Sequence, residues 1–149
     1  MRLFILITGA SSGIGESACL MLLKHGYEVL AGVRSSADAE KLKAAGGVKL
    51  HPLIMDVTDE PGMLLARDQA ISLIGDGALV AIFNNAGIVV NGAVLYIPLE
   101  AWREQFEVNV IGVVRTTQRF FRLLVTERQA HDDHYNRLLN MGSVSGLFA

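Results

Sequence analysis

Five short apolar runs, separated by segments with helical spacing, constrain the fold of this chain most strongly. The runs are apolar at consecutive positions, which is typical of strands covered by helices on both faces of a parallel sheet. Strand and helix alternate along the chain, and this order predicts right-handed crossovers. We therefore expect an α/β fold, a Rossmann-type doubly wound parallel sheet that stops after its fifth strand. The runs cover residues 3–8, 27–33, 48–57, 79–85 and 137–143.

Helical spacing between these runs predicts four helices. Two of them are expected over residues 37–45 and from the N-cap Asp59, with Pro61 in the first turn, to about Ile74. The first helix, over residues 14–25, is expected to bury the stripe Ile14, Ala18, Met21 and Leu22. The longest, over residues 100–128, has apolar positions at helical spacing at Trp102, Phe106, Val110, Val113 and Val114.

The composition describes one domain, residues 1–149, and excludes some partners. The net charge of −2, from 13 basic and 15 acidic residues, gives no basic surface for nucleic acid or an anionic membrane. No apolar stretch reaches the ~18 residues that a membrane span needs. Cys19 is the only cysteine, so no disulfide can form within the chain, and we expect a cytoplasmic location. The 51% hydrophobic content is high for a single domain and predicts apolar surface that something else covers.

The sharpest local signal is TGASSGIG, residues 8–15, between the first predicted strand and the first predicted helix. Gly9 would permit a tight turn, Gly13 would let the backbone approach a pyrophosphate, and Gly15 would let the helix pack closely on the strand. The free amides and partial positive charge of the helix N-terminus would then face the phosphates. In an alternating strand–helix pattern, such a loop favours a dinucleotide site.

The spacing of these glycines resembles the cofactor loop of the short-chain dehydrogenases/reductases, and the resemblance extends along essentially all of the chain. Asp56 and Val57 resemble the adenine-contacting pair of that family. NNAG at 84–87 resembles its fourth-strand motif, and Asn109 lies where the family has a helix asparagine. NMGSVSG, residues 140–146, resembles its serine strand. Five motifs in the right order are far more specific than any one of them.

This resemblance implies a nicotinamide cofactor at the carboxyl edge of the sheet. For Asp56, the alternative is an aspartate that merely precedes the next helix. The residues that the resemblance assigns to the cofactor are Gly9, Ser11, Ser12, Gly13, Ile14, Gly15, Arg34, Asp56, Val57, Asn85, Ala86 and Gly87.

The end of the second strand predicts NADP(H) over NAD(H). Relatives that prefer NAD have an acidic residue there, which binds the ribose 2′-hydroxyl. The matching position is Val33, so a 2′-phosphate would meet no repulsion, and Arg34 could give it a forked, charged hydrogen bond. The alternative is that Arg34 is a solvated arginine in a surface turn.

The catalytic residues implied by the resemblance are only partly in this chain. Asn109 matches the asparagine that holds a water, and Ser143 matches the serine that hydrogen-bonds the substrate oxygen. Ser145 is a competitor for the serine role, and Gly142 stands where the family usually has another serine. The tyrosine and lysine of the family's YxxxK motif have no counterpart, since no lysine follows Lys49.

Three functional hypotheses follow. The chain is the N-terminal part of an NADP-dependent oxidoreductase that moves hydride between nicotinamide and a carbonyl or secondary alcohol. Alternatively, it is a catalytically silent nucleotide-binding or interaction protein, complete at 149 residues, or a degenerate member of the family. Homo-oligomers through the helix at 100–128 are plausible. The HDDH stretch at 131–134 could be imagined as a metal site, but a polar loop is the better interpretation, and we expect no metal.

Overall fold

The computed structural model describes residues 1–125 and 136–143, and its centre is a five-stranded parallel sheet. The strand order is β3-β2-β1-β4-β5, so the chain starts in the middle and winds outward twice. Within the described residues β5 pairs only with β4 and forms one edge of the sheet. This confirms the predicted α/β class. The strands are β1 (Leu3–Ile7), β2 (Glu28–Val33), β3 (Leu50–Ile54), β4 (Ala78–Asn84) and β5 (Arg137–Asn140).

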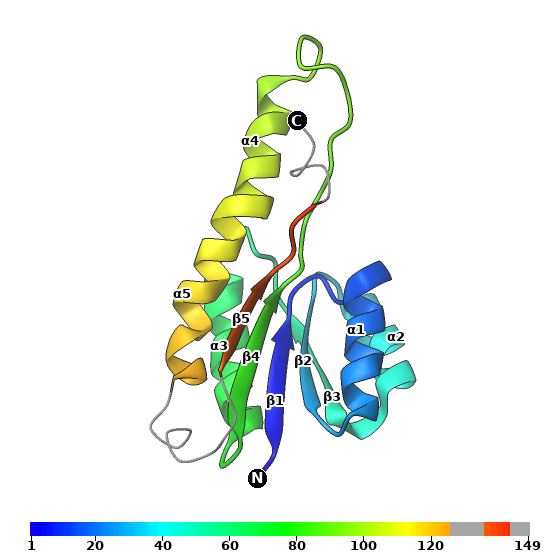
Figure 1. Ribbon diagram of the computed structural model, residues 1–149, viewed down its shortest axis with the longest axis vertical. Coiled ribbons are helices and arrows are strands. Elements are labelled where there is room, and N and C mark those ends of the chain that lie inside the picture. The colour runs from blue at the N-terminus through cyan, green and yellow to red at the C-terminus, as the bar shows by residue number, and fades with distance from the viewer. Residues whose placement is uncertain (126–135, 144–149) are drawn as a thin grey trace.

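Helices cover both faces of the sheet (Figure 1). Helices α1 (Gly13–Lys24) and α2 (Ser36–Gly46) lie on one face. Helices α3 (Glu60–Ile74) and α5 (Gly112–Leu124) lie on the other. Helix α4 (Leu99–Phe106) leads into α5 through the π-helical segment η2 (Glu107–Ile111), and a 3₁₀ turn, η1 (Gly47–Lys49), precedes β3.

Each face has its own apolar core, as expected for strands that are apolar on both sides. Under α3 and α5 the core contains Phe4, Leu6, Met63 and Phe120 among others. Under α1 and α2 it contains Ile7, Cys19 and Leu42 among others. Successive residues of one strand therefore serve opposite cores, and the two layers fix the strand register.

The predicted buried stripe of the first helix is right for Ala18 and Leu22, which are partly buried against the core, and wrong for Ile14 and Met21. Ile14 and Met21 are 62% and 56% exposed, whereas Gly15 and Cys19 are buried. The physical reason is the close approach of α1 to the loop before it. A Cβ atom on Gly15 would lie 2.3 Å from the carbonyl oxygen of Gly9, so the glycine must face inward and sets the rotation of the helix. A pattern of apolar residues does not reveal a glycine that is buried because it lacks a side chain.

The long helix also differs from its predicted pattern. Phe106, Val110 and Val114 are exposed, and the buried stripe of α5 consists of Gly112, Thr116, Phe120 and Leu124. Gly112 lies inward because Val57 packs against it, leaving 2.7 Å between a hypothetical Cβ and the Val57 side chain. Residues 126–128 of the predicted helix lie outside the described residues.

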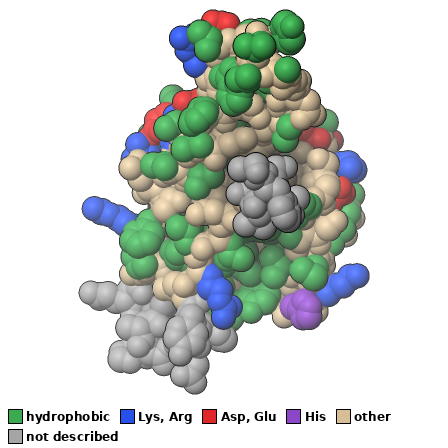
Figure 2. Space-filling view, turned by 45° about the horizontal axis from the view of Figure 1, so that its top comes forward, with side chains coloured by type: hydrophobic (Ala, Val, Ile, Leu, Met, Phe, Trp, Pro, Cys, Tyr) green, Lys and Arg blue, Asp and Glu red, His purple; other side chains and the backbone are tan. Residues whose placement is uncertain are grey.

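One part of the molecule projects beyond the sheet. The segment 85–98 rises from the end of β4, turns, and returns as α4 (Figure 1). Exposed apolar side chains are frequent in it, and Figure 2 shows hydrophobic side chains gathered on this end of the molecule. The most exposed are Val89, Val94, Leu95 and Tyr96, and Leu99 at the start of α4 is exposed beside them. No helix within residues 1–125 and 136–143 has the length and apolar character needed to cross a membrane.

The rotation of α5 gives a prediction about two neighbouring phenylalanines. Phe120 is 0% exposed in the core, while Phe121 is 46% exposed. Phe120→Ala should lower the free energy of unfolding by about 3 to 5 kcal/mol because it leaves a cavity. Phe121→Ala serves as the matched control and should cost under about 1 kcal/mol. Urea unfolding of both variants checks this, and a larger loss from Phe121→Ala would contradict the rotation described here.

Candidate functional site

The carboxyl edge of the sheet brings together residues from all five strands. The glycine loop follows β1, Arg34 follows β2, and Asp56 lies two residues after β3. Asn85 follows β4, and Ser143 lies three residues after β5. The connections after β1 and β4 run to opposite faces of the sheet, so a crevice for a ligand is expected between these two strands.

The glycine loop after β1 has the conformation that its sequence predicts. Gly9 and Gly13 have positive φ angles of 64° and 58°, which residues with a side chain rarely adopt. A Cβ on Gly9 would lie 2.8 Å from the Cα of Ala86, so Gly9 also allows the loop to lie against the end of β4. A Cβ built on Gly13 would meet no atom within 4 Å, so the backbone there is open to an approaching group.

The loop leads directly into the N-terminus of α1. Ser12 is the N-cap residue, and its side chain makes no capping hydrogen bond. The first amides of a 12-residue helix are therefore available to a bound anion, with the partial positive charge of the helix end behind them. Ile14, which is exposed beside them, is placed to contact a ligand. These features fit the phosphates of a dinucleotide.

Thr8 fastens this loop to the end of β4. Its buried hydroxyl oxygen accepts hydrogen bonds from the backbone N–H groups of Asn85 and Ala86, both at 3.0 Å. In return, the Asn85 side-chain amide donates to the carbonyl oxygens of Thr8 at 3.0 Å and Gly9 at 3.1 Å. The side chain of Asn85 thus holds the loop itself. Thr8 was not among the predicted site residues, although its position at the start of TGASSGIG was a usable signal.

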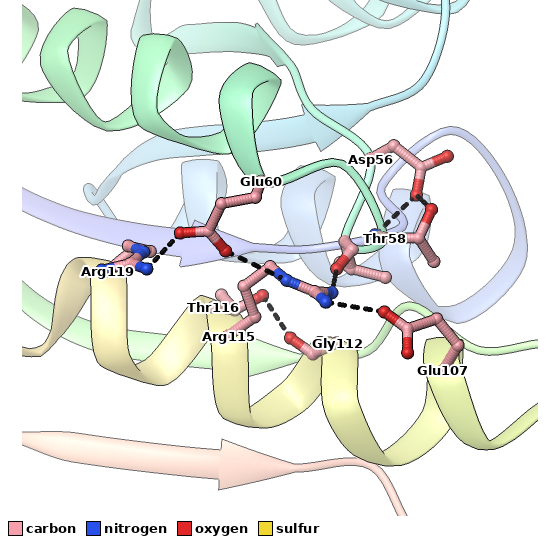
Figure 3. A network of polar contacts seen from close by, with 9 residues as sticks. Asp56, Thr58, Glu60, Glu107, Gly112, Arg115, Thr116 and Arg119 are labelled. Carbon is pink, nitrogen blue, oxygen red and sulfur yellow. Dashed lines mark hydrogen bonds and ion pairs between the residues drawn. The ribbon is translucent and has the colours of Figure 1, made fainter.

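Asp56 lies in a tight turn with one carboxylate oxygen occupied (Figure 3). Its Oδ1 accepts hydrogen bonds from the Thr58 backbone N–H at 2.8 Å and the Thr58 hydroxyl at 2.7 Å. Partial burial raises the pKa of Asp56, but these hydrogen bonds and the positive charges of Arg34 and Arg115 outweigh it and lower the pKa below its ordinary value of 3.8. The carboxylate is therefore charged at neutral pH. This turn also explains why β3 ends at Ile54, earlier than the predicted run.

Arg34 is exposed at the end of β2 and directs charge toward the same corner of the site. It is in no salt bridge within the part of the chain that the structure describes. The preceding residue, Val33, is 1% exposed and packs in the core. The corner formed by Arg34 and Asp56 therefore carries both a free guanidinium and a carboxylate.

Asn109 lies in the π-helical segment η2 and holds the segment after β4. Its Oδ1 accepts from the Ile88 N–H at 2.9 Å, and its Nδ2 donates to the Ile88 carbonyl oxygen at 2.8 Å. The Gly87 backbone passes close by, since a Cβ on Gly87 would lie 3.3 Å from Asn109 Oδ1. Short π-helical insertions are frequent at functional sites, where they redirect a side chain. Here the insertion directs Asn109 toward the NNAG motif.

The end of β5 is joined to the end of β4 by side chains and backbone. Asn84 donates from Nδ2 to Asn140 Oδ1 at 2.9 Å, and the Met141 N–H donates to the Asn84 carbonyl oxygen at 2.9 Å. These contacts lead the chain to Ser143 at the carboxyl edge. Gly142 has open space where a Cβ would lie, so the family's usual serine would fit there. Ser145 and the stretch 131–134 lie outside the described residues.

Comparison with known proteins agrees with this geometry. A family model described as short chain dehydrogenase matches residues 3–149. The chain is 31% identical over 144 residues to NADPH-dependent 3-dehydrocapnine reductase from Ornithobacterium rhinotracheale, with 97% of this chain and 50% of that protein covered. It is 33% identical over 147 residues to 17-beta-hydroxysteroid dehydrogenase type 6 from Bos taurus, with 98% of this chain and 44% of that protein covered.

Solved structures give the same result. The fold matches 3-ketoacyl-(acyl-carrier-protein) reductase from Brucella melitensis, complexed with NADH, with a TM-score of 0.84 and 27% identity. That match covers 94% of this chain and 56% of the other. The chain spans about half the length of the curated relatives it matches.

The hydroxyl of Thr8 generates one testable prediction. Thr8→Val should lower the free energy of unfolding by about 2 to 4 kcal/mol, because two backbone N–H groups lose their acceptor. Thr8→Ser keeps the oxygen and should cost under about 1 kcal/mol, the value of the lost methyl group. Chemical denaturation compares the two variants. Equal losses would show that the hydroxyl does not carry the contact.

The lowered pKa of Asp56 generates a second prediction. A carboxylate whose pKa is depressed in the folded state stabilises the fold above its unfolded pKa, and the contribution disappears as pH falls through the folded value. Asp56→Asn should therefore be less stable than the unaltered protein at neutral pH, with a difference that shrinks below pH 3.8. Thr58→Val, which removes one hydrogen bond to Asp56, should give an intermediate profile. Unfolding measured across the acid range checks this, and a difference that stays constant with pH would contradict it.

Proposed function

Because this chain belongs to the short-chain dehydrogenase family, we propose that it binds NADP(H) and forms the cofactor-binding part of an oxidoreductase that acts on a carbonyl or secondary alcohol. The observation that carries this proposal is the loop from Thr8 to Gly15. It has open backbone at Gly13, lies at the N-terminus of a long helix and is fastened to β4 at the sheet's crevice. The cofactor would supply or accept hydride at its nicotinamide ring.

Each part of the carboxyl edge has a role in this proposal. The loop amides and the start of α1 would hold the pyrophosphate. Asp56 would accept a hydrogen bond from the adenine amino group with Oδ2, since Oδ1 is used by Thr58. Ala86 and Gly87, small residues at the end of β4, would leave room for the ribose. Asn85 would contribute by keeping the loop in place.

The preference for NADP(H) rests on Val33 and Arg34. An apolar residue at the end of β2 neither binds a ribose 2′-hydroxyl nor repels a 2′-phosphate. Arg34 is exposed and outside any salt bridge of the described residues, so its guanidinium is available to that phosphate. The name of the Ornithobacterium relative includes NADPH, which agrees with this preference, whereas the Brucella reductase is complexed with NADH.

For catalysis, we assign Ser143 the hydrogen bond to the substrate oxygen and Asn109 the support of the reacting region. Both polar atoms of the Asn109 side-chain amide bind Ile88, so a water at this position would use the remaining lone pair of Oδ1 or the second hydrogen of Nδ2. The family's tyrosine and lysine have no counterpart in residues 1–149. A second candidate is a nucleotide-binding protein without dehydrogenase activity. Hydride transfer by a chain of these 149 residues alone would exclude that candidate.

We also infer that copies of the chain associate through the helix at 100–128. Phe106, Val110 and Val114, which the sequence places at helical spacing, are exposed on it, and so is Phe121. A patch of this kind is typical of a surface that another helix covers.

The cofactor preference is tested by the affinities for NADPH and NADH. The unaltered protein should bind NADPH more tightly, and Arg34→Ala should weaken NADPH binding by about ten- to a hundredfold, the value of a charged hydrogen bond, with little change for NADH. Arg67→Ala, which removes an arginine from α3, is the control. Fluorescence titration of the complete gene product measures both ligands. Tighter binding of NADH to the unaltered protein would overturn the preference.

A further inference from the structure

Arg115 on α5 makes three polar contacts that no motif of the sequence indicates (Figure 3). Its Nη1 donates to the backbone carbonyl oxygen of Val57. Its Nη2 lies 2.6 Å from Glu107 Oε1, and its Nε lies 3.1 Å from Glu60 Oε2. The side chain is only 16% exposed. All three nitrogens of the guanidinium are thus used, each on a different segment of the chain.

The two glutamates fix the direction of this guanidinium. Glu60 is the first residue of α3 and also pairs with Arg119, and Glu107 is the first residue of η2. Arginine presents its donors in a rigid planar fork, so two carboxylates on different sides leave it one orientation. In that orientation the remaining nitrogen, Nη1, donates to the Val57 carbonyl oxygen. A lysine in the same place could not meet all three partners with fixed geometry.

Val57 is held from a second side by α5. A Cβ on Gly112 would lie 2.7 Å from the Val57 side chain, so the helix backbone touches the valine directly. Arg115 binds the carbonyl oxygen of Val57 while Gly112 packs against its side chain. The peptide that follows Asp56 therefore has little freedom to rotate, and the Asp56 carboxylate is held with it. Asp56 and Val57 form the corner of the site that we assign to the adenine.

We propose that Arg115 is a positioning residue for the adenine half of the cofactor site. It sets the backbone of Asp56 and Val57 by binding the Val57 carbonyl oxygen, with Glu60 and Glu107 fixing its guanidinium. Arg115 itself does not touch the nucleotide. The inference rests on the proposed nucleotide binding, and it adds a link between the adenine corner and η2, the segment that also carries Asn109.

The test measures affinity for NADPH and for 2′,5′-ADP, which contains only the adenosine half of the cofactor, on the complete gene product. Arg115→Gln should weaken the binding of both ligands by the same factor, about tenfold, because a misplaced turn costs about one hydrogen bond to the adenine. Arg115→Lys, which keeps the charge and one donor nitrogen, should have affinities between those of the unaltered protein and Arg115→Gln. Arg122→Gln, an exposed arginine on the same helix, is the control and should bind both ligands like the unaltered protein.

A second readout separates positioning from a general loss of structure. Arg115 contributes to the lowered pKa of Asp56, so Arg115→Gln should raise that pKa and Arg115→Lys should not, as followed by NMR titration without nucleotide. Should Arg115→Gln not fold, Glu107→Gln replaces it. That variant removes one of the two carboxylates that orient the guanidinium and should weaken 2′,5′-ADP binding by a smaller factor.

The outcomes distinguish this inference from the proposed function. If the unaltered protein binds neither NADPH nor NADH, the proposed function fails and the positioning role fails with it. If it binds them and the folded Arg115→Gln variant binds 2′,5′-ADP as tightly as the unaltered protein, only the positioning role is overturned. A loss of NADPH affinity without a matching loss for 2′,5′-ADP overturns the positioning role as well. If Arg115→Gln does not fold, unchanged 2′,5′-ADP binding by Glu107→Gln overturns it.

Discussion

The contact between the β1–α1 turn and the end of β4 is the constraint on which the site depends. Gly9 and Ala86 come so close that no side chain fits between them, and Thr8 and Asn85 exchange hydrogen bonds across the same gap. Backbone N–H groups that are partly shielded from water need acceptors, and here a single hydroxyl serves two of them. The contact holds the phosphate-facing loop and the NNAG segment as one unit. It also fixes α1, whose Gly15 packs against the same loop.

A second set of contacts holds the other end of the site. Val57 lies between Gly112 and Arg115. The ion pairs of Arg115 join α5 to α3 and η2, and its hydrogen bond to the Val57 carbonyl oxygen joins α5 to the turn after β3. Isolated ion pairs on a surface contribute little, but this guanidinium is mostly buried and has three partners, so losing any one of them leaves a charge or a carbonyl unsatisfied. The π-helical segment lies between the two sets of contacts. From there Asn109 binds Ile88, and Glu107 binds Arg115.

The family resemblance and the architecture have a shared physical origin. A parallel sheet with its strand order reversing between β1 and β4 opens a crevice at its carboxyl edge, and every motif in the sequence except Asn109 lies at or just after the end of a strand. The high apolar content of the sequence corresponds to exposed apolar side chains in the structure. They lie on the projecting segment, on the outer side of the α4–α5 helix and on the edge strand β5, where Leu138 and Leu139 are exposed. The relatives that the chain matches are about twice its length.

The sequence by itself determined the alternation of strands and helices, the class of fold and the residues at the strand ends, because apolar runs, glycine spacing and polar residues after strands are local signals. It did not determine which face of each helix is buried. In α1 and α5 that choice is made by Gly15 and Gly112, whose missing side chains allow close contacts that no apolar pattern records. Nor did it reveal Arg115, since an arginine in an amphipathic helix has an ordinary appearance. Only the tertiary structure brings Glu60, Glu107 and the Val57 carbonyl around it, from segments up to 58 positions away along the chain.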